Sequence, residues 1–130
     1  IEAGLLSYGN DMTESNSPLE CGLDRFCSFT DKINYFGKES LLTEKGRGVL
    51  KVIRSISIEA SSLPLCTEPW PIMLNNKEVG KITSSAYSPD FKTNVSLGMV
   101  DSDYLSNDIN LKVEILSDLY NIQLHQQPFI

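Results

Sequence analysis

The chain has 130 residues, a length typical of one domain, and its 41% hydrophobic and 22% charged residues are typical of a globular protein. A net charge of −6 and an isoelectric point near 4.7 argue against nucleic acid and anionic membranes as partners. No apolar run approaches the roughly 20 residues that span a bilayer, so we expect no membrane association.

The first residues are expected to form a strand or a buried segment that ends in a turn at Tyr8–Asp11. The chain does not begin with Met and opens on an apolar residue in mid-pattern. We therefore expect that its start is a truncation of a longer protein. A truncated face would expose Ile1, Leu5 and Leu6, through which the fragment could form a homo-oligomer.

The next part of the chain predicts short elements and a boundary. Ser17 and Pro18 are typical of a helix start, with Gly22 limiting that helix. A strand is predicted over residues 25–29 and a helix over 38–45, which Gly46 ends. The flexible Gly46-Arg47-Gly48 junction predicts a division into residues 1–46, with short helices and strands, and residues 47–130.

Residues after this junction are β in character. Alternating apolar residues predict six short strands, which lie within residues 50–59, 72–74, 79–84, 95–100, 111–115 and 120–124. Turn residues separate them at Asn75-Asn76, Ser88–Asp90 and Ser117-Asp118, and a polar loop is expected over 101–108. Such spacing without long helices favours an antiparallel sandwich or barrel, so the fold class is mainly β.

Three residues interrupt these strand patterns. Gly80 and Gly98 lie inside predicted strands, where Gly marks a bulge, a bend or a close backbone approach. Arg54 interrupts an apolar face, which predicts that this strand reaches a barrel mouth or an interface there. Arg54 also ends a basic stretch that could meet a phosphate or a polyglutamate, although a solvated face is the favoured interpretation.

The residues alone predict no catalytic or metal site. His125 is the only histidine, and its polar surroundings predict a surface or rim position. Cys21, Cys27 and Cys66 lack C-x-x-C spacing, which favours reduced thiols and a cytoplasmic location over a disulfide framework or a metal centre. Trp70 lies between two prolines and is expected to cap the core rather than to cover a ligand.

Short motifs occur in a fixed order through both parts of the chain. They are Ile1-Glu2-Ala3-Gly4, Tyr8-Gly9-Asn10-Asp11, Ser17-Pro18-Leu19-Glu20, Gly22-Leu23, Phe36-Gly37-Lys38-Glu39, Leu41-Leu42, Val79-Gly80, Thr83-Ser84, Ser88-Pro89, Asn94-Val95, Leu97-Gly98 and Pro128-Phe129. In this order they resemble the C-terminal part of the folate-dependent aminomethyltransferase (glycine cleavage T-protein) family. Within it, Gly9–Met12, Glu20–Leu23, Phe26-Cys27, Pro69-Trp70 and Pro128–Ile130 look most like the dimethylsulfoniopropionate demethylase branch.

This resemblance implies a fold and an activity for the parent protein. Residues 47–130 would form its jelly-roll-like C-terminal β-barrel, and residues 1–46 would be a remnant of the folate-binding catalytic body. In the demethylase branch, a small-molecule donor passes a sulfonium methyl group to tetrahydrofolate. In the glycine cleavage branch, a lipoyl carrier protein supplies an aminomethyl group from which a methylene passes to the same cofactor.

The resemblance also implies what this chain lacks. The catalytic acid and the pterin-binding residues of the family precede Ile1, so the chain is expected to contain no catalytic residue and to be inactive alone. Leu5 and Tyr8 are the expected folate-side residues, although Tyr8 could equally be a packed core residue. Tight binding of tetrahydrofolate is not expected. The alternative is a free-standing, non-catalytic binding or dimerisation module.

Overall fold

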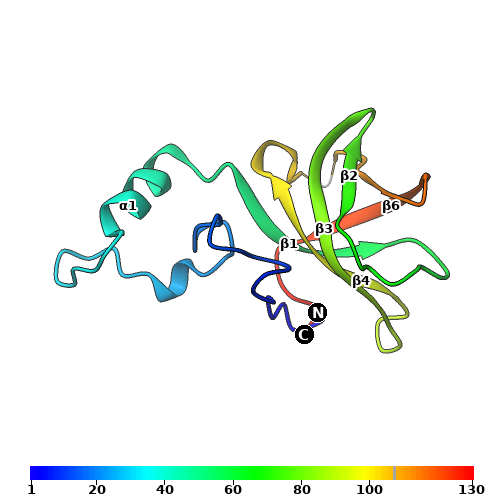
Figure 1. The fold of residues 1–130 in the computed structure, drawn as a ribbon, viewed down its shortest axis with the longest axis horizontal. Coiled ribbons are helices and arrows are strands. Elements are labelled where there is room, and N and C mark those ends of the chain that lie inside the picture. Colours follow the sequence, from blue (N-terminus) through cyan, green and yellow to red (C-terminus); the bar gives the residue numbers. More distant parts are fainter. Residues whose placement is uncertain (107) are drawn as a thin grey trace.

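The computed structural model describes residues 1–106 and 108–130 (Figure 1), so part of the predicted loop 101–108 lies outside the described residues. The elements in chain order are η1 (Asp24–Phe26), α1 (Lys38–Arg47), β1 (Lys51–Ile58), β2 (Trp70–Leu74), β3 (Lys77–Ser88), β4 (Thr93–Asp101), η2 (Ser102–Tyr104), β5 (Lys112–Ile115) and β6 (Asp118–His125). Residues 1–50 form an arm that extends from the barrel of β1–β6, and the chain ends lie side by side at the barrel's edge.

The six strands close into one antiparallel barrel in the order β1-β4-β3-β2-β5-β6. β1 pairs along its whole length with β4, from Lys51 opposite Asp101 to Ile58 opposite Asn94. The barrel closes where β1 also pairs with β6, from Ser55 opposite His125 to Ile58 opposite Ile122. The predicted mainly β, antiparallel barrel is therefore confirmed. Closure leaves no open edge strand among the six, which removes a common route to aggregation.

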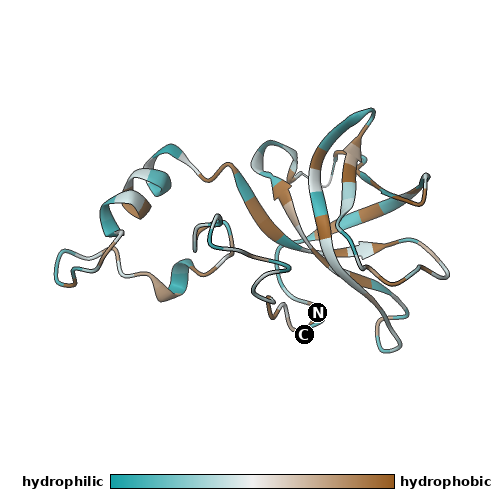
Figure 2. Cartoon of the chain, viewed as in Figure 1, coloured by the Kyte–Doolittle hydropathy of each residue, from teal (hydrophilic) through white to brown (hydrophobic). Residues whose placement is uncertain are grey.

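The barrel interior is filled by branched apolar side chains, as the alternation in the sequence predicted. The brown segments on the strands in Figure 2 mark this hydrophobic content. The buried cluster consists of Ile56, Ile58, Trp70, Ile72, Val79, Ile82, Val100, Leu111, Val113, Ile115 and Leu124. Trp70 is only 9% exposed at the start of β2, so it packs in the core as expected.

The two glycines predicted to mark irregular strand positions lie where β3 and β4 approach closely. A Cβ at Gly80 would lie 2.5 Å from the Met99 carbonyl oxygen, and one at Gly98 would lie 2.7 Å from the Lys81 carbonyl oxygen. Backbone atoms cannot move aside without disturbing the sheet. The prediction of a close backbone approach is therefore confirmed, and glycine is required at both positions.

Strand lengths and turns differ in detail from the predictions. β3 continues to Ser88, because a register shift between Ile82 and Ser84 lets one strand bend instead of ending. The Asn75 turn forms as predicted, with a φ of 55°. The last hairpin turns at Leu116 and Ser117, which have φ of 50° and 71°, one residue earlier than predicted.

The arm departs most from the predictions. No strand forms over residues 1–11 or 25–29: the first contains only a bridge between Tyr8 and Met12, and the second overlaps η1. Ser17 and Glu20 exchange the hydrogen bonds of a capping box, 3.1 and 3.2 Å, but turns follow instead of a helix. Only α1 forms as predicted, two residues longer. The reason is that these apolar residues have little to pack against: Asp11, Cys21 and Lys38 are the arm's only buried residues.

None of the helices in the described part of the chain has the length and apolar content that a bilayer-spanning helix needs. The predicted division at residues 46 and 47 falls in the last turn of α1, four residues before β1 begins. It stays a prediction.

We predict that Gly98→Ala lowers the free energy of unfolding by about 1–3 kcal/mol, because the new methyl group would overlap the Lys81 carbonyl and crowd Ile56. Gly46→Ala is the matched control, since a Cβ at this helical position meets nothing within 4 Å and alanine favours helix. Urea unfolding measures the free energy of unfolding of both variants. Equal stabilities for the two variants would contradict the close approach of β3 and β4.

Candidate functional site

A buried carboxylate joins the arm to the barrel. Asp11 is 5% exposed, and its Oδ1 accepts hydrogen bonds of 2.6 Å from both the Thr83 and Ser84 hydroxyls at the irregular position of β3. Its Oδ2 accepts a 2.9 Å bond from the Ser7 amide. Asn10 adds donations from Nδ2 to the Thr83 carbonyl and the Ser84 hydroxyl, at 3.0 and 2.9 Å. We call these five residues the Asp11 clamp.

The clamp explains why two sequence motifs occur together. Asn10-Asp11 and Thr83-Ser84 are more than 70 residues apart in the sequence, yet the side chains of the two motifs are hydrogen-bonded to each other. The bend of β3 brings Thr83 and Ser84 to the same carboxylate although they are consecutive, because the local shift breaks the strict alternation of side chains. Sequence reasoning identified both motifs but not their contact.

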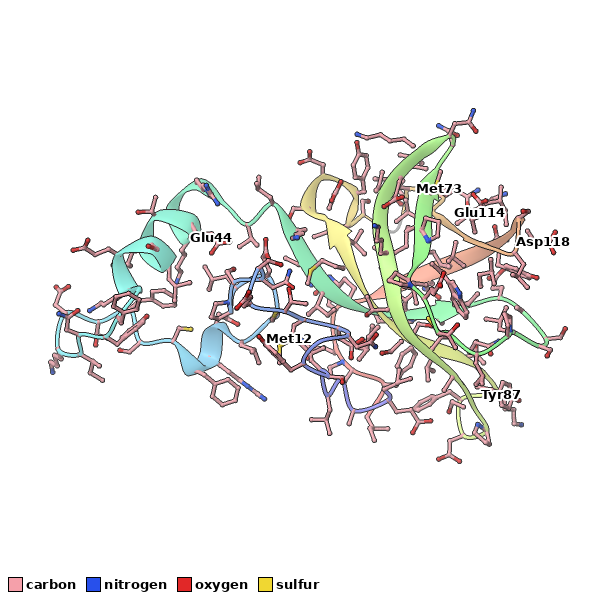
Figure 3. The ribbon with its side chains drawn as sticks, in the orientation of Figure 1. Met12, Glu44, Met73, Tyr87, Glu114 and Asp118 are labelled. Atoms are coloured by element: carbon pink, nitrogen blue, oxygen red, sulfur yellow. The ribbon has the colours of Figure 1, made fainter. Side chains whose placement is uncertain are left out.

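A groove of about 660 Å³ lies between the arm and the barrel. The arm contributes Leu5, Leu6, Met12, Cys21 and residues 22–26, and the barrel contributes Ile53–Ser55 and Leu97. Residues 126–128, which we call the C-terminal strap, form the remaining wall. Met12 is labelled in Figure 3, where it lies between the two parts of the molecule.

The two predicted folate-side residues lie differently with respect to this groove. Leu5 lines it and is 79% exposed. Tyr8 is 70% exposed and is not among the residues that line it. The alternative of Tyr8 as a packed core residue is therefore wrong for this chain. The structure does not bring the two side chains together at one hollow, and their role toward a cofactor stays a prediction.

The strap is held at both of its ends. His125 lies beside it, with Nε2 2.9 Å from the Ser57 hydroxyl and its ring centre 5.0 Å from that of Phe129. Phe129 also packs at 5.4 Å on Phe91, and its amide donates a 2.9 Å bond to the Glu2 carbonyl. Burial lowers the pKa of His125, so the neutral imidazole is favoured. The predicted rim position of His125 is confirmed. Its contacts with Ser57 and Phe129 give it a structural role there.

The titratable groups give no sign of a metal centre or an activated thiol in the described ranges 1–106 and 108–130. No group of three or more His, Cys, Asp or Glu side chains gathers there. The three cysteines are free. Burial, followed by a nearby carboxylate, raises the pKa of Cys21 and of Cys66, and a raised pKa disfavours the nucleophilic thiolate.

The fold and this site define the class of protein: a closed β-barrel module whose arm and strap form a groove at one side. The family model for the glycine cleavage T-protein C-terminal barrel domain matches residues 51–130. The chain therefore belongs to this family.

Relatives match both the arm and the barrel. The chain is 40% identical, over 88% of its length, to dimethylsulfoniopropionate demethylase DmdA of Ruegeria pomeroyi, of which it covers 30%. It is 32% identical, over 99% of its length, to an aminomethyltransferase of Listeria welshimeri, of which it covers 35%. The chain thus spans about a third of the length of these relatives.

A solved structure has the same fold. The glycine cleavage system aminomethyltransferase T of Bartonella henselae superposes with a TM-score of 0.87 at 20% identity. That match covers 99% of this chain and 36% of the other. Because it includes residues 1–50, it supports the arm's path as well as the barrel.

We predict that Asp11→Ala undocks the arm, at a cost of about 2–3 kcal/mol, because the hydroxyls of Thr83 and Ser84 and the Ser7 amide lose their acceptor. Limited proteolysis measures this, with faster cleavage inside residues 1–50 expected. Asp31→Ala removes an exposed arm carboxylate and should leave the pattern unchanged. An intact arm in the Asp11 variant would contradict the clamp.

We predict that stability falls on acidification through the titration of His125. Its pKa is lowered in the folded chain, so its contribution is fully present above the unfolded value of about 6.5 and is lost as the pH falls through the folded pKa. Since it is the only histidine, His125→Gln should remove the pH dependence of urea unfolding between about pH 5 and 7. The same slope in both proteins would contradict this assignment.

Proposed function

We propose that this chain is the C-terminal part of a tetrahydrofolate-dependent one-carbon transferase of the dimethylsulfoniopropionate demethylase type. The observation that carries the proposal is the 40% identity to DmdA, which extends through the arm and the barrel and exceeds the 32% identity to the Listeria welshimeri aminomethyltransferase. The demethylase-like motifs Gly9–Met12 and Glu20–Leu23 lie at the clamp and beside the groove, where they shape this region.

In this proposal the parent enzyme moves a methyl group from a sulfonium donor to tetrahydrofolate, which supplies the accepting nitrogen. The residues that catalyse the transfer belong to the two-thirds of the relatives that this chain does not span. The described residues fit one side of such a cofactor only. The groove offers apolar walls, but Asp24 is the one carboxylate among its described lining residues. The parent enzyme is proposed to be cytoplasmic.

The barrel and arm would then act as a wall of the cofactor site. Leu5 and Tyr8 are exposed on the arm and are free to contact a group held by the rest of the parent protein. In the full-length enzyme, Tyr8→Ala should raise the KM for tetrahydrofolate more than it lowers kcat, and Tyr8→Phe should restore it, because the ring supplies the contact. Equal kinetics for wild type and Tyr8→Ala would remove Tyr8 from the proposed site.

The proposal is tested by assaying the full-length enzyme for methyl transfer from dimethylsulfoniopropionate to tetrahydrofolate. We predict turnover with this donor and none with an aminomethyl-lipoyl carrier protein. Aminomethyl transfer without demethylation would assign the enzyme to the glycine cleavage branch instead.

Residues 1–130 alone should neither turn over the donor nor bind tetrahydrofolate tightly. An upstream reading frame that encodes the two-thirds of the relatives that this chain does not span would support the proposal. A start codon just before Ile1 would instead support the alternative of a free-standing binding or dimerisation module. In that module, apolar residues exposed on the arm, such as Leu5 and Phe36, would form the contact between copies.

A further inference from the structure

Arg54 lies where two hollows meet at the edge of the barrel. It lines the groove between the arm and the barrel, and it also lines a second hollow of about 520 Å³ beside Leu105 and residues 123–125. The strap residues Gln126–Pro128 border both hollows. Arg54 is two residues before the core residue Ile56 on β1, so its side chain occupies the position at which the apolar interior gives way to solvent.

The Arg54 guanidinium is half-buried without a counter-charge. Its Nη1 donates a 2.9 Å hydrogen bond to the Ile53 carbonyl. Within the described part of the chain, no carboxylate oxygen lies within 4 Å of it, and its remaining N–H donors have no protein acceptor. An arginine presents five donors in a fixed fork, so most of this fork is unused. Burial lowers the pKa of Arg54, in keeping with a cation that has no carboxylate partner among the described residues.

A second arginine lines the same groove. The Arg25 guanidinium lies 4.7 Å from the centre of the Phe26 ring and has no ion pair among the described residues. The groove therefore contains two cations against one carboxylate, that of Asp24. This excess is unusual in a chain with a net charge of −6. It produces a local positive field that favours an anion.

Apolar side chains form much of the rest of the lining, beside Ser55, Gln126 and Gln127. Leu5, Leu6, Leu23 and Pro128 line the groove together with the Phe26 ring. A ligand that fits this lining has one anionic group for the arginines and a small apolar or aromatic body for the walls. A single negative charge matches the surplus of one cation better than a doubly charged phosphate does.

We propose that the groove binds a small organic monocarboxylate, with the carboxylate on the Arg54 fork, Arg25 as a second cation and the apolar body between Leu5 and Phe26. Arg54 is the residue that sets the preference for a carboxylate, since its planar fork matches the two carboxylate oxygens. This site uses only residues of this chain. It shares Leu5 and the groove with the proposed cofactor site, but its test does not depend on the proposed transferase function.

The test is a titration of the 130-residue chain with phenylacetate, followed by the amide resonances in a two-dimensional NMR spectrum. Phenylacetamide is the matched ligand, because it keeps the ring and removes only the charge. We expect saturable shifts near Arg54, Gln126 and Leu6 with a Kd of about 1 mM, and at least about tenfold weaker binding of phenylacetamide.

Variants locate the site. Arg54→Gln should weaken phenylacetate binding by at least about tenfold, and Arg54→Lys should restore only part of it, because lysine keeps the charge but lacks the fork. Arg47→Gln is the matched control, since Arg47 is exposed on α1 outside the groove. Dispersed resonances verify the fold of each variant. If Arg54→Gln does not fold, Arg25→Gln and the comparison of the two ligands in the wild-type chain provide the test.

Three results would overturn the proposal. They are phenylacetamide binding as tightly as phenylacetate, Arg54→Gln binding as well as wild type, and shifts that do not saturate. Displacement of phenylacetate by an equal concentration of inorganic phosphate would overturn the assignment to a carboxylate, because it would show a site for phosphate instead. Activity of the parent enzyme is not part of this test, so its outcome is separate from that of the proposed transferase function.

Discussion

The Asp11 carboxylate is the constraint on which the arrangement of arm and barrel depends. It is buried, it accepts three hydrogen bonds, and two of its donors come from the barrel. The arm has little apolar packing of its own, so polar contacts must supply most of its attachment. Without the clamp, the groove would lose one wall, because Leu5, Leu6 and Met12 belong to the segment that Asp11 holds.

Two further sets of hydrogen bonds define the path of the arm, one to the barrel and one within the arm. The Ile53 amide donates a 2.8 Å bond to the Glu20 carbonyl, which holds the capping-box turn against β1. Lys38 donates bonds of 2.6 Å to the Thr30 and Ile33 carbonyls, and so closes the loop before α1. Such bonds define a path for the backbone but bury little surface. This explains why large side chains such as Phe36 remain fully exposed.

The barrel was predictable because its signals are local and consistent. Alternating apolar residues predicted the strands, and Asn75-Asn76 predicted a turn. Gly80 and Gly98 indicated a bulge, a bend or a close backbone approach, and the structure shows a close approach of β3 and β4. The arm was not predictable in the same way. Its apolar residues, such as those of Arg25–Phe29, have the pattern of a strand, but no partner strand lies beside them, so turns and a 3-10 helix form instead.

The candidate site was only partly predictable. The sequence singled out Arg54 and His125 as rim residues, and the structure confirms these positions. It did not reveal that Asp11 reaches Thr83 and Ser84, because a contact across 72 residues depends on the bend in β3. One of the motifs in this strand pair, Thr83-Ser84, joins the arm to the barrel through its hydrogen bonds with Asn10 and Asp11.

The hydrogen-exchange rate of the Ser7 amide tests the clamp most directly, because the Asp11 carboxylate is its acceptor. If the clamp holds the arm on the barrel, this amide should exchange at least about 30-fold more slowly than in an unfolded peptide, which corresponds to about 2 kcal/mol. Exchange at the unprotected rate in the wild-type chain would show that the arm is not held by Asp11 and would contradict the account.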